Sequence, residues 1–509
     1  MVRLFGEEKA PLLERYTDDI ESPKPTSDAD EAATLEALRA AEVARRRRRC
    51  RRRFFHFFAL TLIAAAFIGV RHYKRWGKTN ISRFFPEDEP HKLPVVPGVT
   101  LEHCTDWKED GKGPGATVFE SGDGYYIPPR DKRPAPSRKP FKKSKFRAIT
   151  SHAEFELDAD KPLYFVSRGS FAFGSLTVLQ SEDESTEIKT TVTVTTDEHD
   201  HSNSEHWHQQ FLDVIRVCKI KKDGDSEATG VGIFTPEWHH KGPHRGRHHH
   251  HSGKFHVIVQ LPKSAEPLTL ESLETDMPIF SQTLTTGEGA VLYGKLHLQG
   301  ALAPIGALDA SGENVTVRTS NAPIEGNFRA SRSIVLQTEN APINVAVELE
   351  NANSTQPSTA SLHTSNAPIT SRNTLTATKW SEDNTGSFNV FTGTANSKIH
   401  LTFPSAPINS TLGLTADTSL GNIDVSLHPT YEGEFSLATS LAKADVLVGE
   451  GEADPEGKDR KRSALTHPMR SEVSGETWWG EYKGKQKHWG NVKLRTALSP
   501  VTLRFNGGA

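Results

Sequence analysis

Histidine is concentrated in one part of this chain. Twelve of its 23 histidines lie between residues 199 and 256, and eleven of these fall in two polar segments, 197–208 and 237–251. Imidazole is a common ligand of Zn, Cu and Ni, and closely spaced histidines can chelate one ion. The candidate metal ligands are His199, His201, His206, His208, His239, His240, His244, His248, His249, His250 and His251.

Two interpretations of these histidines stay open. A specific metal site needs fixed ligands and supporting hydrogen bonds, whereas histidine runs in Gly/Pro loops are mobile, so we expect weak binding of Zn, Cu or Ni and no required cofactor. Alternatively the segments form a pH-sensitive surface, because free histidine gains its charge near pH 6.5. If the histidines bind metal, the chain is a metal-binding surface protein, and this is an alternative function.

Other residues indicate covalent modification in an oxidising compartment. Asn314, Asn353 and Asn409 each begin an Asn-x-Ser/Thr glycosylation sequence. The chain has three cysteines; Cys104 and Cys218 can form one disulfide, and Cys50, among arginines, is a candidate for palmitoylation.

No motif for catalysis is present. The sequence has no G-x-S-x-G elbow, H-E-x-x-H zinc motif, phosphate-binding loop or dinucleotide fingerprint. Asp309, Glu325, Glu339 and Asp424 are isolated acids. We expect a protein without catalytic residues, and a carbohydrate-active enzyme on a β-helix is a second alternative.

The histidine segments lie between predicted strands. Residues 187–196, 210–220, 230–236 and 254–262 alternate polar and apolar residues, which predicts an antiparallel meander within a region spanning 150–285. In such a meander the loops after the first and third strands leave the sheet at the same end. The two histidine segments would then share one surface.

A repeated hexad organises the region from 286 to 448. TSNAPI occurs at 319–324 and 364–369, TENAPI at 338–343, and related hexads at 300–305, 403–408 and 496–501. Proline fixes the backbone and removes a hydrogen-bond donor, so each hexad predicts a corner between strands. The predicted repeat corners are Pro304, Pro323, Pro342, Pro368, Pro407 and Pro500. A period near 20 residues with alternating strands between corners predicts a β-solenoid or elongated sandwich. Residues 449–470 are expected to be a disordered insert, followed by closing strands in 471–509.

The strand–NAPI corner–strand pattern resembles the bacterial putative-adhesin β-repeat domain, and more closely a fungal domain of unknown function found behind one membrane span. The resemblance covers roughly 150–509. It implies an all-β fold placed outside the cytoplasm, and it carries over no catalytic residues. The chain departs from the bacterial pattern by using Ala-Pro where that family prefers glycine.

An apolar segment predicts a membrane anchor. Residues 54–70 are seventeen residues without formal charge, and a block of eight arginines precedes them at 45–49 and 51–53. This length suffices for a transmembrane helix, extending to about 76, and the arginines favour a cytosolic N-terminus. The arginine block alone would also suit nuclear import or nucleic-acid binding. Beside the apolar segment we interpret it as a membrane stop. The net charge of −3 does not favour nucleic-acid binding by the rest of the chain.

The flanking segments complete a single-pass type II organisation. Residues 1–53 form a cytosolic tail with an Arg-rich helix, and 71–149 form a Pro/Gly/Lys-rich stalk. Glu8, Leu12 and Leu13 match the acidic-dileucine signal that clathrin-type adaptors bind. The expected protein is adhesin-like, with a structural or binding role at the cell surface or in the secretory, endosomal or vacuolar lumen. Its expected partners are the lipid bilayer, adaptors, and glycans or other surface proteins.

Overall fold

The computed structural model describes residues 93–107, 147–181, 187–198, 204–223, 227–237, 253–353, 355–378, 385–449, 453–482, 484 and 488–506. All of them belong to one compact unit, called the β unit below. Strands hold 62 % of these residues and there is one helix, α2 (Ser204–Val214), so the all-β prediction is confirmed. The predicted tail and membrane anchor lie outside the described residues. Among the described residues, no helix combines the length and apolarity needed to cross a bilayer.

Hydrogen bonding arranges the strands in two rows. Row A contains, in spatial order, β2 (Arg147–Asp158), β5 (Glu187–Glu198), β8 (Gly253–Leu261), β4 (Gly174–Gln180), β10 (Phe280–Leu284), the first half of β12 (Ile305–Arg318), the first half of β13 (Ile324–Gln337), β14 (Ile343–Asn351), β16 (Ile369–Ala377), β18 (Ile399–Ser405), β20 (Ile423–Ser426), β26 (Val501–Arg504) and β22 (Ala444–Leu447).

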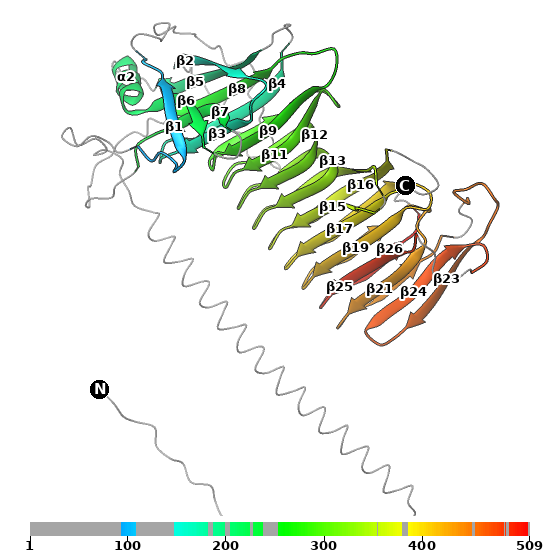
Figure 1. The fold of residues 1–509 in the computed structure, drawn as a ribbon. Coiled ribbons are helices and arrows are strands. Elements are labelled where there is room, and N and C mark those ends of the chain that lie inside the picture. Colours follow the sequence, from blue (N-terminus) through cyan, green and yellow to red (C-terminus); the bar gives the residue numbers. More distant parts are fainter. Residues whose placement is uncertain are drawn as a thin grey trace, which may run out of the picture. The chain divides into compact units, whose positions relative to one another are not determined.

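Row B contains β1 (Val99–Cys104), β6 (Arg216–Lys222), β7 (Ala228–Phe234), β3 (Leu163–Arg168), β9 (Leu268–Asp276), β11 (Val291–Gln299), the second halves of β12 and β13, β15 (Ser358–His363), β17 (Ser387–Thr394), β19 (Thr411–Thr418), β25 (Gly490–Thr496), β21 (Gly433–Thr439), β24 (Glu472–Trp479) and β23 (Arg462–Pro468). Figure 1 shows the resulting stack.

Each turn of the chain adds one strand to each row, and such a turn is called a rung below. Among β9 to β22, and between these strands and β25 or β26, all pairs within a row are parallel, as expected for a chain that winds in one direction. The solenoid architecture follows from this pairing. β12 and β13 are long strands that bend and serve both rows.

An aliphatic ladder fills the space between the rows. Each row A strand from β12 to β26 begins with a residue at the same register, and all of them are at most 1 % exposed. These residues are Ile305, Ile324, Ile343, Ile369, Ile399, Ile423 and Val501. With the inward residues of row B they form one core, which explains why the hexads end in isoleucine or valine.

The threonine that begins each hexad forms a hydrogen bond to the neighbouring corner. Thr338 Oγ1 donates to Ala322 O, Thr364 Oγ1 to Ala341 O and Thr394 Oγ1 to Ala367 O, each within 3.2–3.4 Å. All three threonines are buried, so a hydroxyl at this position satisfies a carbonyl of the neighbouring corner.

Asparagine side chains join the corners along the stack. Nδ2 of Asn340 donates to Asn321 Oδ1 (2.7 Å), Nδ2 of Asn366 to Asn340 Oδ1 (2.6 Å), and Nδ2 of Asn396 to Asn366 Oδ1 (2.5 Å). The rung after TSNAPI (364–369) therefore turns at TANSKI (394–399), a hexad without proline.

The assignment of Pro407 as a repeat corner is wrong. Residues 403–405 still belong to β18, and Pro407 lies in the opposite corner, between β18 and β19. Pro304, Pro323, Pro342, Pro368 and Pro500 share one corner column, because the carbonyl of each accepts a backbone amide of the neighbouring row A strand at the same register.

The sequence order of the rungs is broken once. β25 pairs with both β19 and β21, and β26 pairs with both β20 and β22, all in parallel. The rung formed by β25 and β26 is thus inserted between two rungs that precede it in sequence (Figure 1). Beyond β21, the hairpin β23–β24 covers the edge of row B with antiparallel pairs.

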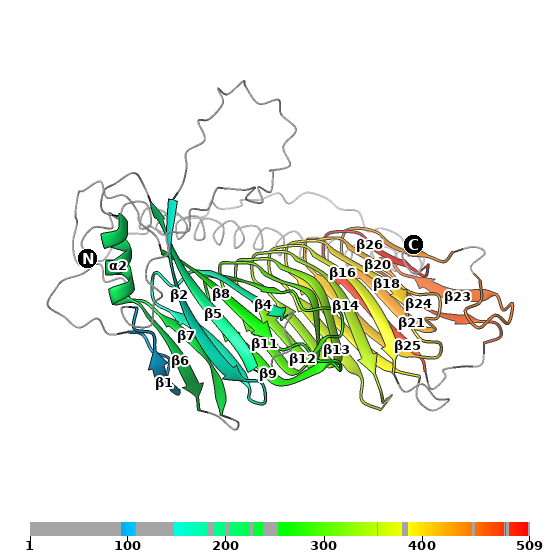
Figure 2. The same cartoon turned by 90° about the horizontal axis from the view of Figure 1, so that it is seen from above.

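The N-terminal end of the β unit is only partly the predicted meander. β2, β5 and β8 are antiparallel neighbours, but β3 and β4 pair in parallel with strands on both sides and form the first rung. The strand predicted from 210 begins at Arg216, because 204–214 form α2. His208, Phe211, Leu212 and Ile215 are buried, which is the i, i+3, i+4, i+7 spacing of a helix face. Figure 2 shows α2 at this end and β23 at the other.

Two segments expected to lack structure are ordered in part. In the predicted stalk, β1 pairs with β6, and Val95, Val99 and Leu101 pack on the outer face of row B. In the predicted disordered insert, Asp454 is enclosed by hydrogen bonds from Arg460 and from three backbone amides, and β23 follows. The carboxylate of Asp454 supplies the acceptors that hold this polar loop in one conformation.

Candidate functional site

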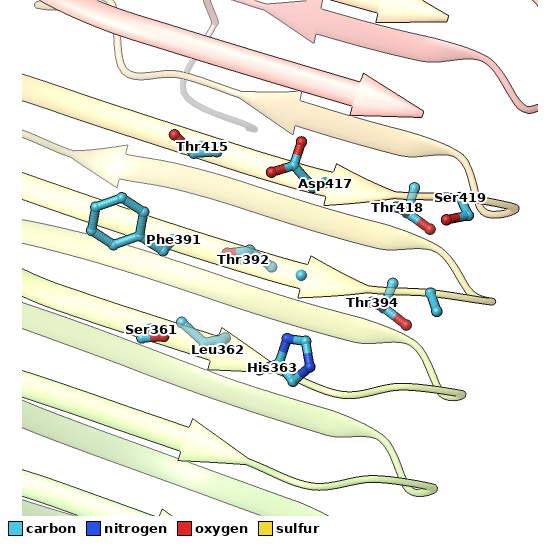
Figure 3. A pocket seen from close by; sticks show the side chains of 12 residues that line it. Ser361, Leu362, His363, Phe391, Thr392, Thr394, Thr415, Asp417, Thr418 and Ser419 are labelled. Atoms are coloured by element: carbon cyan, nitrogen blue, oxygen red, sulfur yellow. The ribbon is translucent and has the colours of Figure 1, made fainter. Parts of the chain in front are cut away.

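An open groove lies on the outer face of row B, over β15, β17 and β19 (Figure 3). Its volume is about 470 Å³. Its outward side chains form two columns across three adjacent strands. Ser361, Phe391 and Thr415 share one register. His363, Gly393 and Asp417 share the next outward register.

Phe391 is the apolar feature of the groove. Its neighbours Phe388 and Val390 are buried in the core, whereas Phe391 points to the opposite side of β17 and is 49 % exposed. The residues beside it at the same register are Ser361 and Thr415, which are short. An exposed phenyl ring between two small hydroxyl residues leaves its apolar surface open to a ligand.

Gly393 makes a notch beside the ring. A Cβ at residue 393 would lie 3.1 Å from Nδ1 and 3.6 Å from Cε1 of His363. The imidazole therefore leans over the space that a side chain at 393 would occupy. Asp417 flanks the same position from β19, so an imidazole and a carboxylate border a gap with no side chain.

The polar groups of the groove belong to side chains. β15, β17 and β19 each have a hydrogen-bonded strand on both sides, so no strand edge is open there. The lining residues hold one carboxylate and one imidazole, with hydroxyls from serine and threonine, and no lysine or arginine. The groove can bind a ligand through an apolar face and hydrogen bonds, with little net charge.

His208 is a structural residue. Its Nε2 lies 2.8 Å from Ser151 Oγ and its Nδ1 2.8 Å from Thr196 Oγ1. The side chain is only 3 % exposed, and burial lowers its pKa to about 4. Both ring nitrogens are engaged in the core, so His208 is not part of a shared metal-binding surface.

The other predicted metal ligands are not tested by the fold. His206 lies in α2, whereas His199, His201, His239, His240, His244, His248, His249, His250 and His251 lie outside the described residues. Within the ranges that the structure describes, no group of three or more His, Cys, Asp or Glu residues has the geometry to hold a metal ion.

The predicted modification sites differ in accessibility. Asn409 is exposed in a turn with a φ of 59°, and Asn353 is exposed with its Oδ1 accepting from Thr355. Asn314 lies within β12, half-buried, and its Oδ1 accepts from Ser333 Oγ at 2.9 Å. Cys104 and Cys218 form a disulfide between β1 and β6. Glu8, Leu12, Leu13 and Cys50 lie outside the described residues.

None of the groove residues was predicted from the sequence as a site residue, although the pattern of residues 387–394 indicates an unusual outward face. In the strand SFNVFTGT (387–394), period-two alternation places Phe388 and Val390 inward and therefore Phe391 and Gly393 outward. A phenylalanine and a glycine at consecutive outward positions are unusual for a solvent-facing strand, and this pattern could have indicated a binding site. Its neighbours His363 and Asp417 are remote in sequence and depend on the register of the rungs.

Comparison with known proteins adds little to this geometry. No family model matches the chain, and no curated protein matches it. One solved structure is similar, the crystal structure of a "putative cell adhesion protein" from Clostridium sporogenes, with 8 % identity, 70 % of this chain and 99 % of that chain covered, and a TM-score of 0.14. At that TM-score the similarity supports no conclusion about fold or function.

Proposed function

We propose that this chain is a non-catalytic, adhesin-like binding protein whose β unit holds its ligand in the groove over β15, β17 and β19. The observation that carries the proposal is Phe391, a phenylalanine that is 49 % exposed between hydrogen-bonding side chains on a rigid, fully paired part of the stack. A large apolar side chain with a few convergent polar groups is the usual composition of a binding site.

The acids that a β-helix enzyme would use support a role without catalysis. Asp424 pairs with Arg504 and lies 3.6 Å from His400 Nδ1. Asp309 accepts from Gly289 N and Ser311 Oγ, both at 3.0 Å. These carboxylates have structural partners, and they are not in the groove.

The sequence supports a membrane-anchored setting for this activity. The arginine block and apolar segment 54–70 favour a type II anchor with a cytosolic tail, and the sequons and the disulfide favour an oxidising lumen or the cell surface for the β unit. The tail would bind clathrin-type adaptors through Glu8, Leu12 and Leu13. Protease protection of membranes from cells that produce an N-terminally tagged full chain tests this topology, because the tag should be digested while the β unit is protected.

The binding role is tested by adhesion. Cells that display the full chain should adhere to at least one surface in a panel of immobilised polysaccharides and extended proteins, and Phe391→Ala should reduce that adhesion. Leu441→Ala is the matched control, since Leu441 is 76 % exposed at a corner outside the groove. Equal adhesion by the wild type and Phe391→Ala, with both displayed at the same level, would contradict the proposal.

A further inference from the structure

We infer that the ligand of the groove is a neutral polysaccharide that lies across the rungs, with one sugar ring on Phe391. This inference rests on the proposed function and narrows it to one class of ligand. Its first support is the combination of an apolar platform with short hydroxyl side chains at its own register, Ser361 and Thr415. A pyranose presents C–H groups on its face and hydroxyls at its rim, and this arrangement matches both.

The notch supplies the second contact. His363 and Asp417 lie at the same register on either side of Gly393, one register from Phe391. Imidazole can donate or accept a hydrogen bond, and carboxylate accepts two, so together they can bind neighbouring hydroxyls of one sugar. The absent side chain at 393 lets the hydroxyl-bearing rim approach the sheet.

The pairing of the strands argues against an extended peptide. Peptides that bind β-sheets usually add a strand to an open edge, where backbone groups supply the affinity. Here β15, β17 and β19 are internal strands whose backbone groups already have partners on both sides. Recognition has to use side chains, and these are the donors and acceptors that hydroxyls need.

The charge and the spacing favour a neutral chain of sugars. The lining residues contain no lysine or arginine to bind an acidic glycan, and their one carboxylate would repel it. Neighbouring rungs are about 4.8 Å apart, a distance comparable to the length of one sugar residue. On the flanking strands the column of Phe391 continues with Val335 on β13 and Lys493 on β25, and the column of Gly393 continues with Gln337 and Arg495. The absence of cations therefore holds for the groove over β15, β17 and β19, and Gln337, Lys493 and Arg495 can donate hydrogen bonds to sugar hydroxyls beyond it.

The test is binding of the full chain, held in detergent micelles, to an array of neutral glucans, mannans and N-acetylglucosamine oligomers, with acidic glycans and extended peptides on the same array. We expect retention by at least one neutral glycan. Phe391→Ala should weaken it by at least about tenfold, because an aromatic anchor is removed. Gly393→Val should also weaken it, because the branched side chain fills the notch while suiting a strand.

Two control variants keep the test interpretable. Thr370→Val places a valine at an outward position of row A away from the groove, and Leu441→Ala removes an exposed apolar side chain elsewhere; both should bind normally. Retention only by acidic glycans or by peptides, or glycan binding that Phe391→Ala leaves unchanged, would overturn the inference. If adhesion depends on Phe391 while no neutral glycan binds, the ligand class is wrong and the proposed binding role stands. If neither depends on Phe391, both fail.

Discussion

The buried His208 should make the stability of the β unit depend on pH in a way that one substitution removes. Its ring is 3 % exposed between two hydroxyls, and burial lowers its pKa from 6.5 to about 4. In the unfolded chain the pKa is the ordinary one. Below pH 6.5 the unfolded state therefore binds a proton that the folded state does not bind, and the free energy of unfolding falls as the pH falls from 6.5 toward 4.

The size of this effect follows from the two pKa values. Between pH 7.5 and pH 5.0 the difference in proton binding at His208 corresponds to about 2 kcal/mol of lost stability, and by pH 4 to about 3 kcal/mol. Other histidines whose partial burial lowers the pKa add to the total, namely His256, His297 and His428. Their contribution is the same in a His208 variant and cancels in a comparison.

The assay is urea unfolding of the full chain in detergent at pH 7.5 and 5.0, for the wild type and His208→Gln. Glutamine does not titrate, so the loss of stability between the two pH values should shrink by about 2 kcal/mol, whatever the variant costs at pH 7.5. His467→Gln, at an exposed histidine, is the control for the substitution itself. An equal loss in the wild type and His208→Gln would refute the argument that burial keeps this imidazole neutral.

Three further predictions concern the stack and its modification. Ile369→Ala should lower the free energy of unfolding by about 3–4 kcal/mol, since Ile369 is fully buried in the ladder, whereas Leu441→Ala, measured in the same urea titration, should change it little. Asn366→Ala should cost about 1 kcal/mol, because it removes hydrogen bonds to both neighbouring corners; a change below the error of the titration would mean that the asparagine ladder adds no stability. Asn409→Gln should remove a glycan-dependent mass shift, whereas Asn314→Gln should not, because Asn314 lies half-buried in a strand; the opposite pattern in mass spectrometry would contradict the accessibility argument.

The rungs could be predicted from the sequence wherever one hexad marks one turn. Thr, Asn and Ile recur at fixed positions in TSNAPI and TENAPI because each contacts the neighbouring rung. The threonine hydroxyl donates to the alanine carbonyl of the neighbouring hexad, the asparagine bonds to the equivalent asparagine, and the isoleucine pairs at the same register. The prediction failed at 403–408, where the visible proline led to a false corner. The true corner at 394–399 keeps the threonine, asparagine and isoleucine, and it has Lys398 in place of the proline. The carbonyl of Lys398 accepts the amide of Ile369, as the proline carbonyls do in the other corners.

The groove was harder to predict for a physical reason. Its two columns combine residues that are 24 or 30 positions apart along the chain, such as Phe391 with Thr415 and with Ser361. Which residues meet depends on the register between rungs, and this register is set by the true corners. If one corner is assigned wrongly, every residue of that rung is matched with the wrong residues on the neighbouring strands. The helix α2 was missed because its buried residues Phe211 and Leu212 are followed directly by the apolar residues of β6, so the segment reads as the beginning of one strand.

The inserted rung bears on how the chain is made. Residues 433–447 leave the ribosome before residues 490–504, yet β25 and β26 lie between them and the preceding rung. When β21 leaves the ribosome, its partner strand β25 has not yet been synthesised. If β21 pairs with β19 instead, that pairing is non-native and must break before β25 can insert. Synthesis from N- to C-terminus can build the stack one rung at a time only as far as β20. The last part of the row has to assemble in a single step after the segment that completes it has emerged.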